Sequence, residues 1–351
     1  MAPTVEDVLQ SLRQVQDPDL RRDIVSLNFV KDVVVNGAAV AFTVELTTPA
    51  CPVKEQLEQQ CHDVVAALEG VSQVSVTMTA QTRTRQTEAE DLIPQVKQCI
   101  AIASGKGGVG KSTVALNLAV ALAETGARVG LMDADVYGPS IPMMMGTQGD
   151  RPFTRNQRIV PIERFGIASM SLGYLMEEGQ SVLWRGPMVA GTVRQLLADV
   201  EWGELDYLLV DLPPGTGDAP MSLAQLVPLT GVAIVSTPQT VAANIAGKCA
   251  ALFRRLNSPI LGVIENMADY ACPNCGHESR LFRGLSGEEL SANLKVPYLG
   301  SIPLDPAIGE SQESGQPAVL TSPESHQAKA FRAVAGRLAA QASIVTSARA
   351  Q

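Results

Sequence analysis

The sequence has 351 residues, of which 46% are hydrophobic and 18% are charged, and its formal net charge at pH 7 is −9. A chain of this length and composition can bury a sizeable core and is expected to form two domains. The acidic balance and the lack of a basic stripe argue against nucleic acid as a partner, and the lack of a long apolar run or a signal pattern argues against a membrane or secreted location, so we expect a cytoplasmic protein.

Residues 1–82 have the pattern of a small α/β domain. The expected elements, in chain order, are a helix at 5–15, strands at 31–35 and 39–46, a helix at 52–68 and a strand at 71–78. Asn36-Gly37, between the first two strands, is typical of a two-residue hairpin turn. Pro52 suits the first turn of the second helix.

Three segments of this region resemble the MIP18-like domain of iron–sulfur assembly factors: Asp17-Pro18-Asp19-Leu20, Asp23-Ile24-Val25-Ser26-Leu27 and Thr47-Thr48-Pro49-Ala50-Cys51-Pro52. Cys51 stands just before a helix start, a position that favours the thiolate. A role in handling a cluster or a partner, and a small buried thiol in a docking domain, both remain open.

A polar stretch follows this domain, with Arg83 and Arg85 ahead of Glu88 and Glu90. Such a composition is typical of a linker. We therefore predict a linker at 83–96 and a second domain at 97–351.

The stretch at 105–113 fits the phosphate-binding template G-x-x-x-x-G-K-[ST]. Its residues are Gly105, Lys106, Gly107, Gly108, Val109, Gly110, Lys111, Ser112 and Thr113. An apolar strand is expected before it at 99–103, and a run of helix-forming residues at 112–123 follows and stops at Gly126. In this context the backbone N–H groups hold the phosphates of a nucleoside triphosphate, Lys111 contacts the β- and γ-phosphates, and Ser112 ligates Mg²⁺.

Acidic residues stand at the ends of later strands. Further strands are expected at 128–132, 207–211, 232–238 and 259–267. Asp133 and Asp135 follow the first of these, and Asp211 ends the second. Ligands of open parallel sheets sit outside the carboxyl ends of the strands, and an acid in the place of Asp211 can hold Mg²⁺ through water. The pattern predicts a doubly wound, mostly parallel α/β sheet.

The loop at 105–113 looks like the deviant Walker A loop of the MinD/ParA/nitrogenase-iron-protein class of ATPases, which carries a second lysine directly after the first glycine, here Lys106. The resemblance implies a P-loop NTPase fold, ATP as the nucleotide, and a homodimer in which Lys106 reaches the partner's nucleotide. It also implies that Lys106 and Lys111 stabilise charge during hydrolysis. A solvated loop lysine is the alternative interpretation of Lys106.

The resemblance to this class extends beyond the loop. The segment 133–140 resembles switch I, which implies that Asp135 positions the attacking water and that Asp133 lies near the Mg²⁺ shell. Asp211-Leu-Pro-Pro-Gly-Thr-Gly-Asp218 resembles switch II. Pro238 and Asn266 correspond to residues near the adenine.

Cys272-Pro273-Asn274-Cys275-Gly276-His277 is a Cys-x-x-Cys turn with three interpretations: half of a zinc site, half of an iron–sulfur site, or a redox disulfide. The flanking proline and glycine suit a loop better than the helix start of a thioredoxin-type motif. Both metal sites need about four ligands, and one chain offers two cysteines with His277 as a possible third. A two-fold dimer brings two copies of the pair together.

This turn, after Glu265-Asn266-Met267, and the segment 211–218 resemble the Mrp (ApbC) family of iron–sulfur cluster carriers over about 96–341; MinD and ParA lack the Cys-x-x-Cys. The resemblance implies a [4Fe–4S] cluster held by Cys272 and Cys275 of each chain and delivered to apo iron–sulfur proteins. Spacing alone leaves zinc open. Two other functions remain: a positioning ATPase with a structural zinc, and an ATP-gated electron donor like the nitrogenase iron protein, whose cluster cysteines are well separated in sequence.

The C-terminal segment has apolar residues at helical spacing, Phe331, Val334 and Leu338. Basic terminal helices of MinD-like proteins bind membranes. This one is alanine-rich and sparsely basic, so we predict that it packs on the domain.

Overall fold

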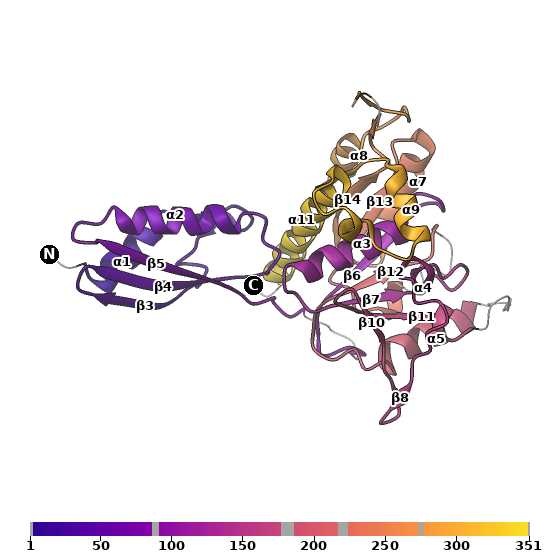
Figure 1. Ribbon diagram of the computed structural model, residues 1–351, viewed down its shortest axis with the longest axis horizontal. Helices are drawn as coiled ribbons and strands as arrows, with labels where there is room; N and C mark the ends of the chain where they lie inside the picture. Colours follow the sequence, from indigo (N-terminus) through magenta and orange to yellow (C-terminus); the bar gives the residue numbers. More distant parts are fainter. Residues whose placement is uncertain are drawn as a thin grey trace.

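The computed structural model describes residues 3–85, 91–176, 186–216, 224–272, 275 and 277–349. The chain forms a small N-terminal unit and a larger unit, drawn at the left and right of Figure 1. None of the helices in the described residues is long and apolar enough to cross a membrane. Gly217 and Asp218 of the predicted switch II, and Glu88 and Glu90 of the predicted linker, lie outside the described residues.

The N-terminal unit packs two helices against a three-stranded sheet. Its elements are α1 (Val5–Leu12), β1 (Gln16–Asp17), β2 (Arg22–Asp23), β3 (Val30–Asn36), β4 (Ala39–Leu46), α2 (Lys54–Ala66) and β5 (Gln73–Ala80). The sheet order is β3-β4-β5, with β3 antiparallel and β5 parallel to β4. Helix α1 starts with a reciprocal capping box between Thr4 and Asp7 and ends at Leu12, three residues earlier than its periodicity predicted. The predicted hairpin is confirmed, but its two loop residues are Gly37 and Ala38, because Asn36 is the last paired residue of β3; Gly37 has φ +61°.

The larger unit is built on a central sheet that has eight strands in the described residues. In spatial order these are β10 (Ile162–Arg164), β11 (Ile167–Ser171), β7 (Val129–Asp133), β12 (Leu205–Asp211), β6 (Val96–Ser104), β13 (Gly231–Ser236), β14 (Ile260–Asn266) and β17 (Tyr298–Ile302). Every neighbouring pair is parallel except β10–β11. The doubly wound, mostly parallel sheet predicted from the sequence is therefore confirmed.

Alternate side chains of these strands enter two separate cores, one on each face of the sheet. On β12, Tyr207 and Leu209 join the core beneath α3 (Lys111–Glu124) and α11 (His326–Arg349). Leu208 and Val210 join the core beneath α5 (Gly186–Ala198), α7 (Thr240–Arg255) and α8 (Gly287–Leu294). Strands buried on both faces account for the continuous apolar runs in the sequence.

Several short elements connect the main ones. They are α4 (Ile141–Met144), β8 (Thr154–Arg155), β9 (Arg158–Ile159), η1 (Leu172–Tyr174), β15 (Tyr270–Ala271), β16 (Glu278–Ser279), α9 (Pro306–Glu313) and α10 (Ala318–Thr321). Helix α11 runs well beyond the predicted segment, and Phe331, Val334 and Leu338 are fully buried in the core, so the prediction that it packs on the domain is confirmed.

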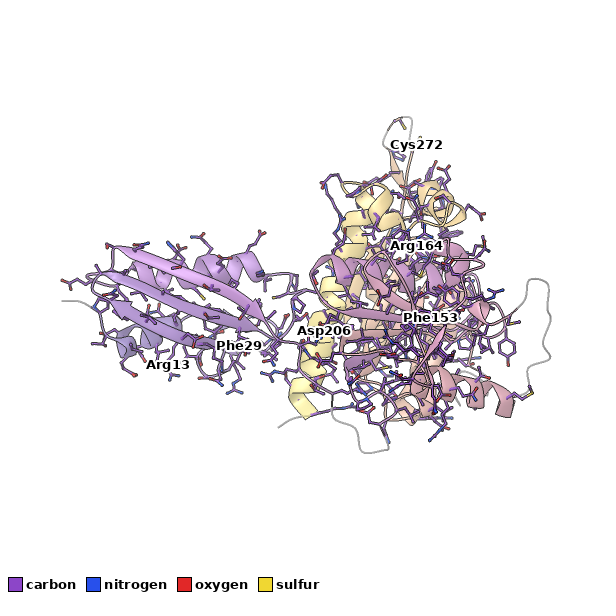
Figure 2. All side chains as sticks on the ribbon, turned by 60° about the horizontal axis from the view of Figure 1, so that its bottom comes forward. Arg13, Phe29, Phe153, Arg164, Asp206 and Cys272 are labelled. Carbon is purple, nitrogen blue, oxygen red and sulfur yellow. The ribbon has the colours of Figure 1, made fainter. Side chains whose placement is uncertain are left out.

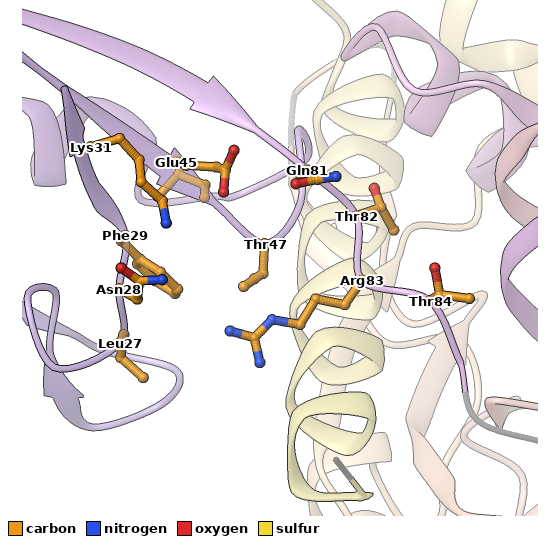
Figure 3. Close-up of a pocket in the computed structure, with 11 residues that line it drawn as sticks. Leu27, Asn28, Phe29, Lys31, Glu45, Thr47, Gln81, Thr82, Arg83 and Thr84 are labelled. Carbon is orange, nitrogen blue, oxygen red and sulfur yellow. The ribbon is translucent and has the colours of Figure 1, made fainter. Parts of the chain in front are cut away.

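The two units are in direct contact where the loop after β4 meets β12 and α11. The hydroxyls of Thr48 and Tyr207 form a buried hydrogen bond of 2.7 Å. Ala50 joins the core of the larger unit, and its carbonyl approaches Gly336 of α11. A cavity of about 290 Å³ lies at this junction, and Figure 3 shows Arg83 reaching into it. The domain boundaries at 82 and 97 stay a prediction.

Candidate functional site

The glycine-rich loop lies between β6, which ends at Ser104, and α3, which begins at Lys111. Gly108 and Gly110 have φ of +76° and +79°, values that glycine adopts without strain. A Cβ on Gly110 would overlap the Asn266 amide, and one on Gly105 would meet the backbone of Ile245 at 2.6 Å. Close packing therefore requires glycine at 105, and both close packing and backbone angle require it at 110.

A cavity of about 320 Å³ opens over this loop. Its lining residues are Ser104, Lys106, Gly107, Gly108, Gly110, Lys111, Ser112, Thr113, Asp135, Ser140, Met143, Met144, Pro214, Gln312 and Glu313. The fold thus brings the loop together with the predicted switch I acid and with Pro214 of the predicted switch II. Gln312 and Glu313 come from α9, which the sequence analysis did not connect with the loop.

Lys111, Ser112 and Asp211 form a buried cluster at the start of α3. The Lys111 Nζ lies 2.5 Å from the Asp211 Oδ1, and the Ser112 Oγ donates to the Asp211 Oδ2 at 2.5 Å. The Lys111 side chain is 6% exposed and that of Asp211 is not exposed at all. A buried charge pair of this kind is stable only because each partner satisfies the other.

Asp133 and Asp135 stand at the neighbouring strand end, and the register pairs Asp133 of β7 with Asp211 of β12. The Asp133 carboxylate accepts hydrogen bonds from the Ser171 hydroxyl at 3.0 Å and from the Asp135 backbone N–H at 3.1 Å. Burial and the nearby Asp211 carboxylate raise the pKa of Asp133 above its usual range. Burial also raises the pKa of Asp135, whose Oδ1 is buried without a hydrogen-bond partner.

The predicted second lysine is held within its own chain. The Lys106 Nζ donates to the Gln239 Oε1 at 2.8 Å, and Gln239 is the N-cap residue of α7.

The predicted adenine-site residue Asn266 contacts the phosphate loop. It ends β14, and its Nδ2 donates a hydrogen bond to the Val109 carbonyl at 2.8 Å. Neither Pro238 nor Asn266 lines the cavity described above.

The two predicted cluster cysteines lie on a short ribbon at one extremity of the larger unit, where Figure 2 labels Cys272. Strands β15 and β16 pair antiparallel, and the Cys272 N–H donates to the His277 carbonyl at 3.0 Å. Cys272 is half-buried and Cys275 is exposed. Pro273, Asn274 and Gly276 lie outside the described residues.

Cys51 and the core thiols differ from this pair. Cys51 is half-buried in the loop that contacts the larger unit, and burial raises the pKa of its thiol. Cys61, Cys99 and Cys249 are buried, and burial raises the pKa of each to about 12. These three thiols stay protonated at neutral pH.

The parallel sheet, the loop at 105–113 and the acids at the adjoining strand ends define a P-loop ATPase of the MinD/ParA class. The model of the NUBPL iron-transfer P-loop NTPase family matches residues 95–339, and that of an iron–sulfur cluster assembly protein matches residues 5–77. The chain belongs to the NUBPL iron-transfer P-loop NTPase family.

Similar proteins carry related names. An iron–sulfur cluster carrier protein of Synechocystis sp. is 45% identical over 347 residues, covering 97% of this chain and 98% of that protein. One from Deinococcus radiodurans is 45% identical over 341 residues, covering 97% and 96%. The mouse iron–sulfur cluster transfer protein NUBPL is 46% identical over 248 residues, covering 70% and 78%.

Two solved structures resemble the larger unit. A nucleotide-binding protein from Archaeoglobus fulgidus in complex with ADP has a TM-score of 0.57 and 39% identity, covering 64% of this chain and 88% of that one. The cell division ATPase MinD from Pyrococcus furiosus has a TM-score of 0.52 and 26% identity, covering 68% and 97%. These similarities agree with the ATPase fold.

Proposed function

We propose that this chain is an ATP-hydrolysing carrier that holds a [4Fe–4S] cluster between two copies of itself and transfers it to apo iron–sulfur proteins. The observation that carries the proposal is the position of the C-terminal end of β14, which contacts one candidate site and leads directly into the other. Asn266 at its end is bonded to the phosphate loop, and the ribbon that follows directly holds Cys272. The cluster is the cargo, and the names of the relatives support that cargo.

A homodimer would complete both sites. Cys272 and Cys275 give two thiolates in each chain, and a two-fold axis beside the ribbon would bring four together, the usual number for this cluster. The exposure of Cys275 and the place of the ribbon at an extremity leave room for a second copy there. Lys106 would leave Gln239 and reach the partner's nucleotide.

The loop residues fit ATP with Mg²⁺. Ser112, Asp211 and Asp133 offer hydroxyl and carboxylate oxygens, the donors that Mg²⁺ prefers, on side chains that the fold already gathers. When bound, Mg²⁺ supplies positive charge to the phosphate oxygens. Lys111 would turn from Asp211 to the β- and γ-phosphates, and Asp135 would accept the proton of the attacking water.

Backbone and side-chain bonds give a physical route from nucleotide to cluster. The loop carbonyl of Val109 accepts from Asn266, and beyond β14 the Ala268 N–H donates to the Ile302 carbonyl at 3.1 Å. The Leu304 N–H donates to the Asp269 carbonyl at 2.7 Å, which fixes the base of the cysteine ribbon. A shift of the loop on ATP binding would therefore reach the cysteines through β14.

The alternatives are less well supported. The matching family and relatives are named for iron transfer rather than for positioning or electron donation. The resemblance to MinD is a similarity of fold, and it does not favour a positioning function. For the compartment we propose the cytoplasm, because all six cysteines are free thiols and such usage is typical of a reducing compartment.

The coupling is tested by cluster transfer in full-length protein. A Lys111→Ala variant should load a cluster normally, because Lys111 supplies no ligand to the cluster, yet lose the acceleration of transfer by ATP. Transfer is measured as returning activity of an apo [4Fe–4S] enzyme. Lys97→Ala serves as the control, since Lys97 pairs with Asp206 outside the cavity. Unchanged ATP-dependent transfer by Lys111→Ala would refute the coupling.

A further inference from the structure

Helix α9 supplies a wall of the nucleotide cavity that no motif indicates. The Gln312 Nε2 is buried and has no hydrogen-bond partner, and the residue lines the same cavity as the loop. Asp135 lines the same cavity, and its Oδ1 is also buried without a partner. Burying one such group without a partner is destabilising, so two in a single cavity point to something that both atoms bind.

The two unpaired atoms are of opposite kinds. The amide Nε2 of Gln312 can only donate hydrogen bonds, and the carboxylate Oδ1 of Asp135 can only accept them. A phosphate group, which only accepts, would satisfy the first atom and leave the second unpaired. A water molecule satisfies both, because its oxygen accepts from Nε2 while its O–H donates to Oδ1.

Neither lysine of the phosphate loop donates to the Asp135 Oδ1. The Lys111 Nζ is bonded to Asp211, and the Lys106 Nζ is bonded to Gln239. Within the part of the chain that the structure describes, the Gln312 Nε2 and the Asp135 Oδ1 therefore both lack a hydrogen-bond partner.

Close backbone packing fixes the position of α9 relative to switch I. Gly315, two residues beyond the end of α9, has φ +68°, and a Cβ there would lie 2.4 Å from the Cα of Gly146. Gly146, two residues beyond the end of α4, has φ +61°. Because neither glycine can carry a side chain without strain, α9 and the segment that follows Asp135 hold a fixed separation.

We infer that Gln312 binds the water that attacks the γ-phosphate, together with Asp135. Gln312 donates from Nε2 to the water oxygen, and the water donates to the Asp135 Oδ1. The water oxygen forms the bond to the γ-phosphorus, the bond from that phosphorus to the β–γ bridging oxygen breaks, and ADP leaves with its electron pair. Asp135 takes the water's proton and returns it to phosphate or solvent. The inference rests on the proposed function, since it requires ATP in this cavity.

Gln312→Leu tests the inference, because leucine keeps much of the volume and removes the donor. Full-length protein is assayed for kcat and KM with ATP, and for the Kd of ADP with a fluorescent ADP analogue. We expect kcat to fall by about tenfold or more, the effect of removing one hydrogen bond to the transition state, with ADP affinity within about twofold of wild type. Glu310→Gln, a change at an exposed residue of the same helix that does not line the cavity, should keep kcat within about twofold.

Two results would overturn the inference: an unchanged kcat in Gln312→Leu, or a loss of ADP affinity that parallels the loss of kcat. Gln312→Met is the second variant, because it keeps the length of the side chain, removes the donor and adds no charge, and it should also lower kcat without weakening the binding of ADP. A wild-type protein that binds no ADP would instead refute the nucleotide site itself, and with it this inference.

Discussion

The hydrogen bond between Thr48 and Tyr207 predicts a measurable energetic coupling between the two units. Both side chains are buried, and their oxygens are 2.7 Å apart. Burial raises the pKa of Tyr207 to about 12, so its hydroxyl stays protonated over the range in which the protein is handled. The bond is therefore constant from neutral to mildly alkaline pH.

The expected loss of unfolding free energy depends on the hydrogen bonds that remain after the substitution. Tyr207→Phe removes one neutral hydrogen bond, worth about 1 kcal/mol net. The Thr48 Oγ1 still accepts from the Ala50 N–H at 3.1 Å, so it is not left wholly unpaired and the loss stays near that value. In a domain of roughly 150–250 residues, 1 kcal/mol shifts Tm by about 2–4 °C.

A double-mutant cycle isolates the contact. Thr48→Val, Tyr207→Phe and the pair are unfolded in urea, with circular dichroism as the probe, and the coupling energy should be about 1 kcal/mol. Tyr174→Phe is the matched control: its hydroxyl is equally buried but bonds Thr147 and Ser169 inside the larger unit. It should be additive with Thr48→Val. Additivity of Tyr207→Phe with Thr48→Val, within about 0.3 kcal/mol, would refute the docking of the two units at this point.

Three more predictions concern other parts of the chain. Gln239→Leu removes the intrachain partner of Lys106, so the ATP concentration needed for dimer formation, measured by light scattering, should be several-fold lower. An unchanged concentration would contradict the idea that Gln239 holds Lys106 within its own chain. Gly315→Ala should cost about 2 kcal/mol or more in urea unfolding, whereas Gly309→Ala, inside α9 with no atom within 4 Å of its new Cβ, should be neutral or stabilising. In native protein at pH 8, iodoacetamide should modify exposed Cys275 and spare Cys61, Cys99 and Cys249, because raised pKa values keep those thiols protonated; peptide mass spectrometry checks this, with denatured protein as control.

The sequence predicts the nucleotide loop well because its chemistry is local. Nine contiguous residues carry the phosphate site, and the strand and helix that flank them have strong patterns. The acids Asp133 and Asp211 were also predictable, since parallel strands place their carboxyl ends at one edge, and the register confirms the pairing.

Other parts of the site depend on contacts that no local pattern encodes. Gln312 is far along the chain from the loop, on a short helix whose place is set by the approach of Gly315 to Gly146. The bond from Lys106 to Gln239 joins two loops through side chains alone. The strands β8 to β11 are short and lack a clear period, so the sequence analysis did not find them.

The docking of the N-terminal unit was likewise outside the reach of pattern analysis. Nothing in the segment that holds Thr48 and Cys51 shows that Ala50 completes the core of a second unit. Polar composition at 83–96 predicted a linker, yet the Arg85 side chain is 2% exposed and pairs with Asp91 at 2.6 Å. Because Arg85 and Asp91 pair, part of a segment that its polar composition predicts to be exposed is buried instead.

Anaerobic reconstitution with iron and sulfide tests the central claim most directly. The carrier function predicts a coloured protein with about four irons per two chains, lost in Cys272→Ser and kept in Cys249→Ala, which changes a buried thiol of α7. Uptake of one zinc per dimer, with no iron bound under the same conditions, would contradict it.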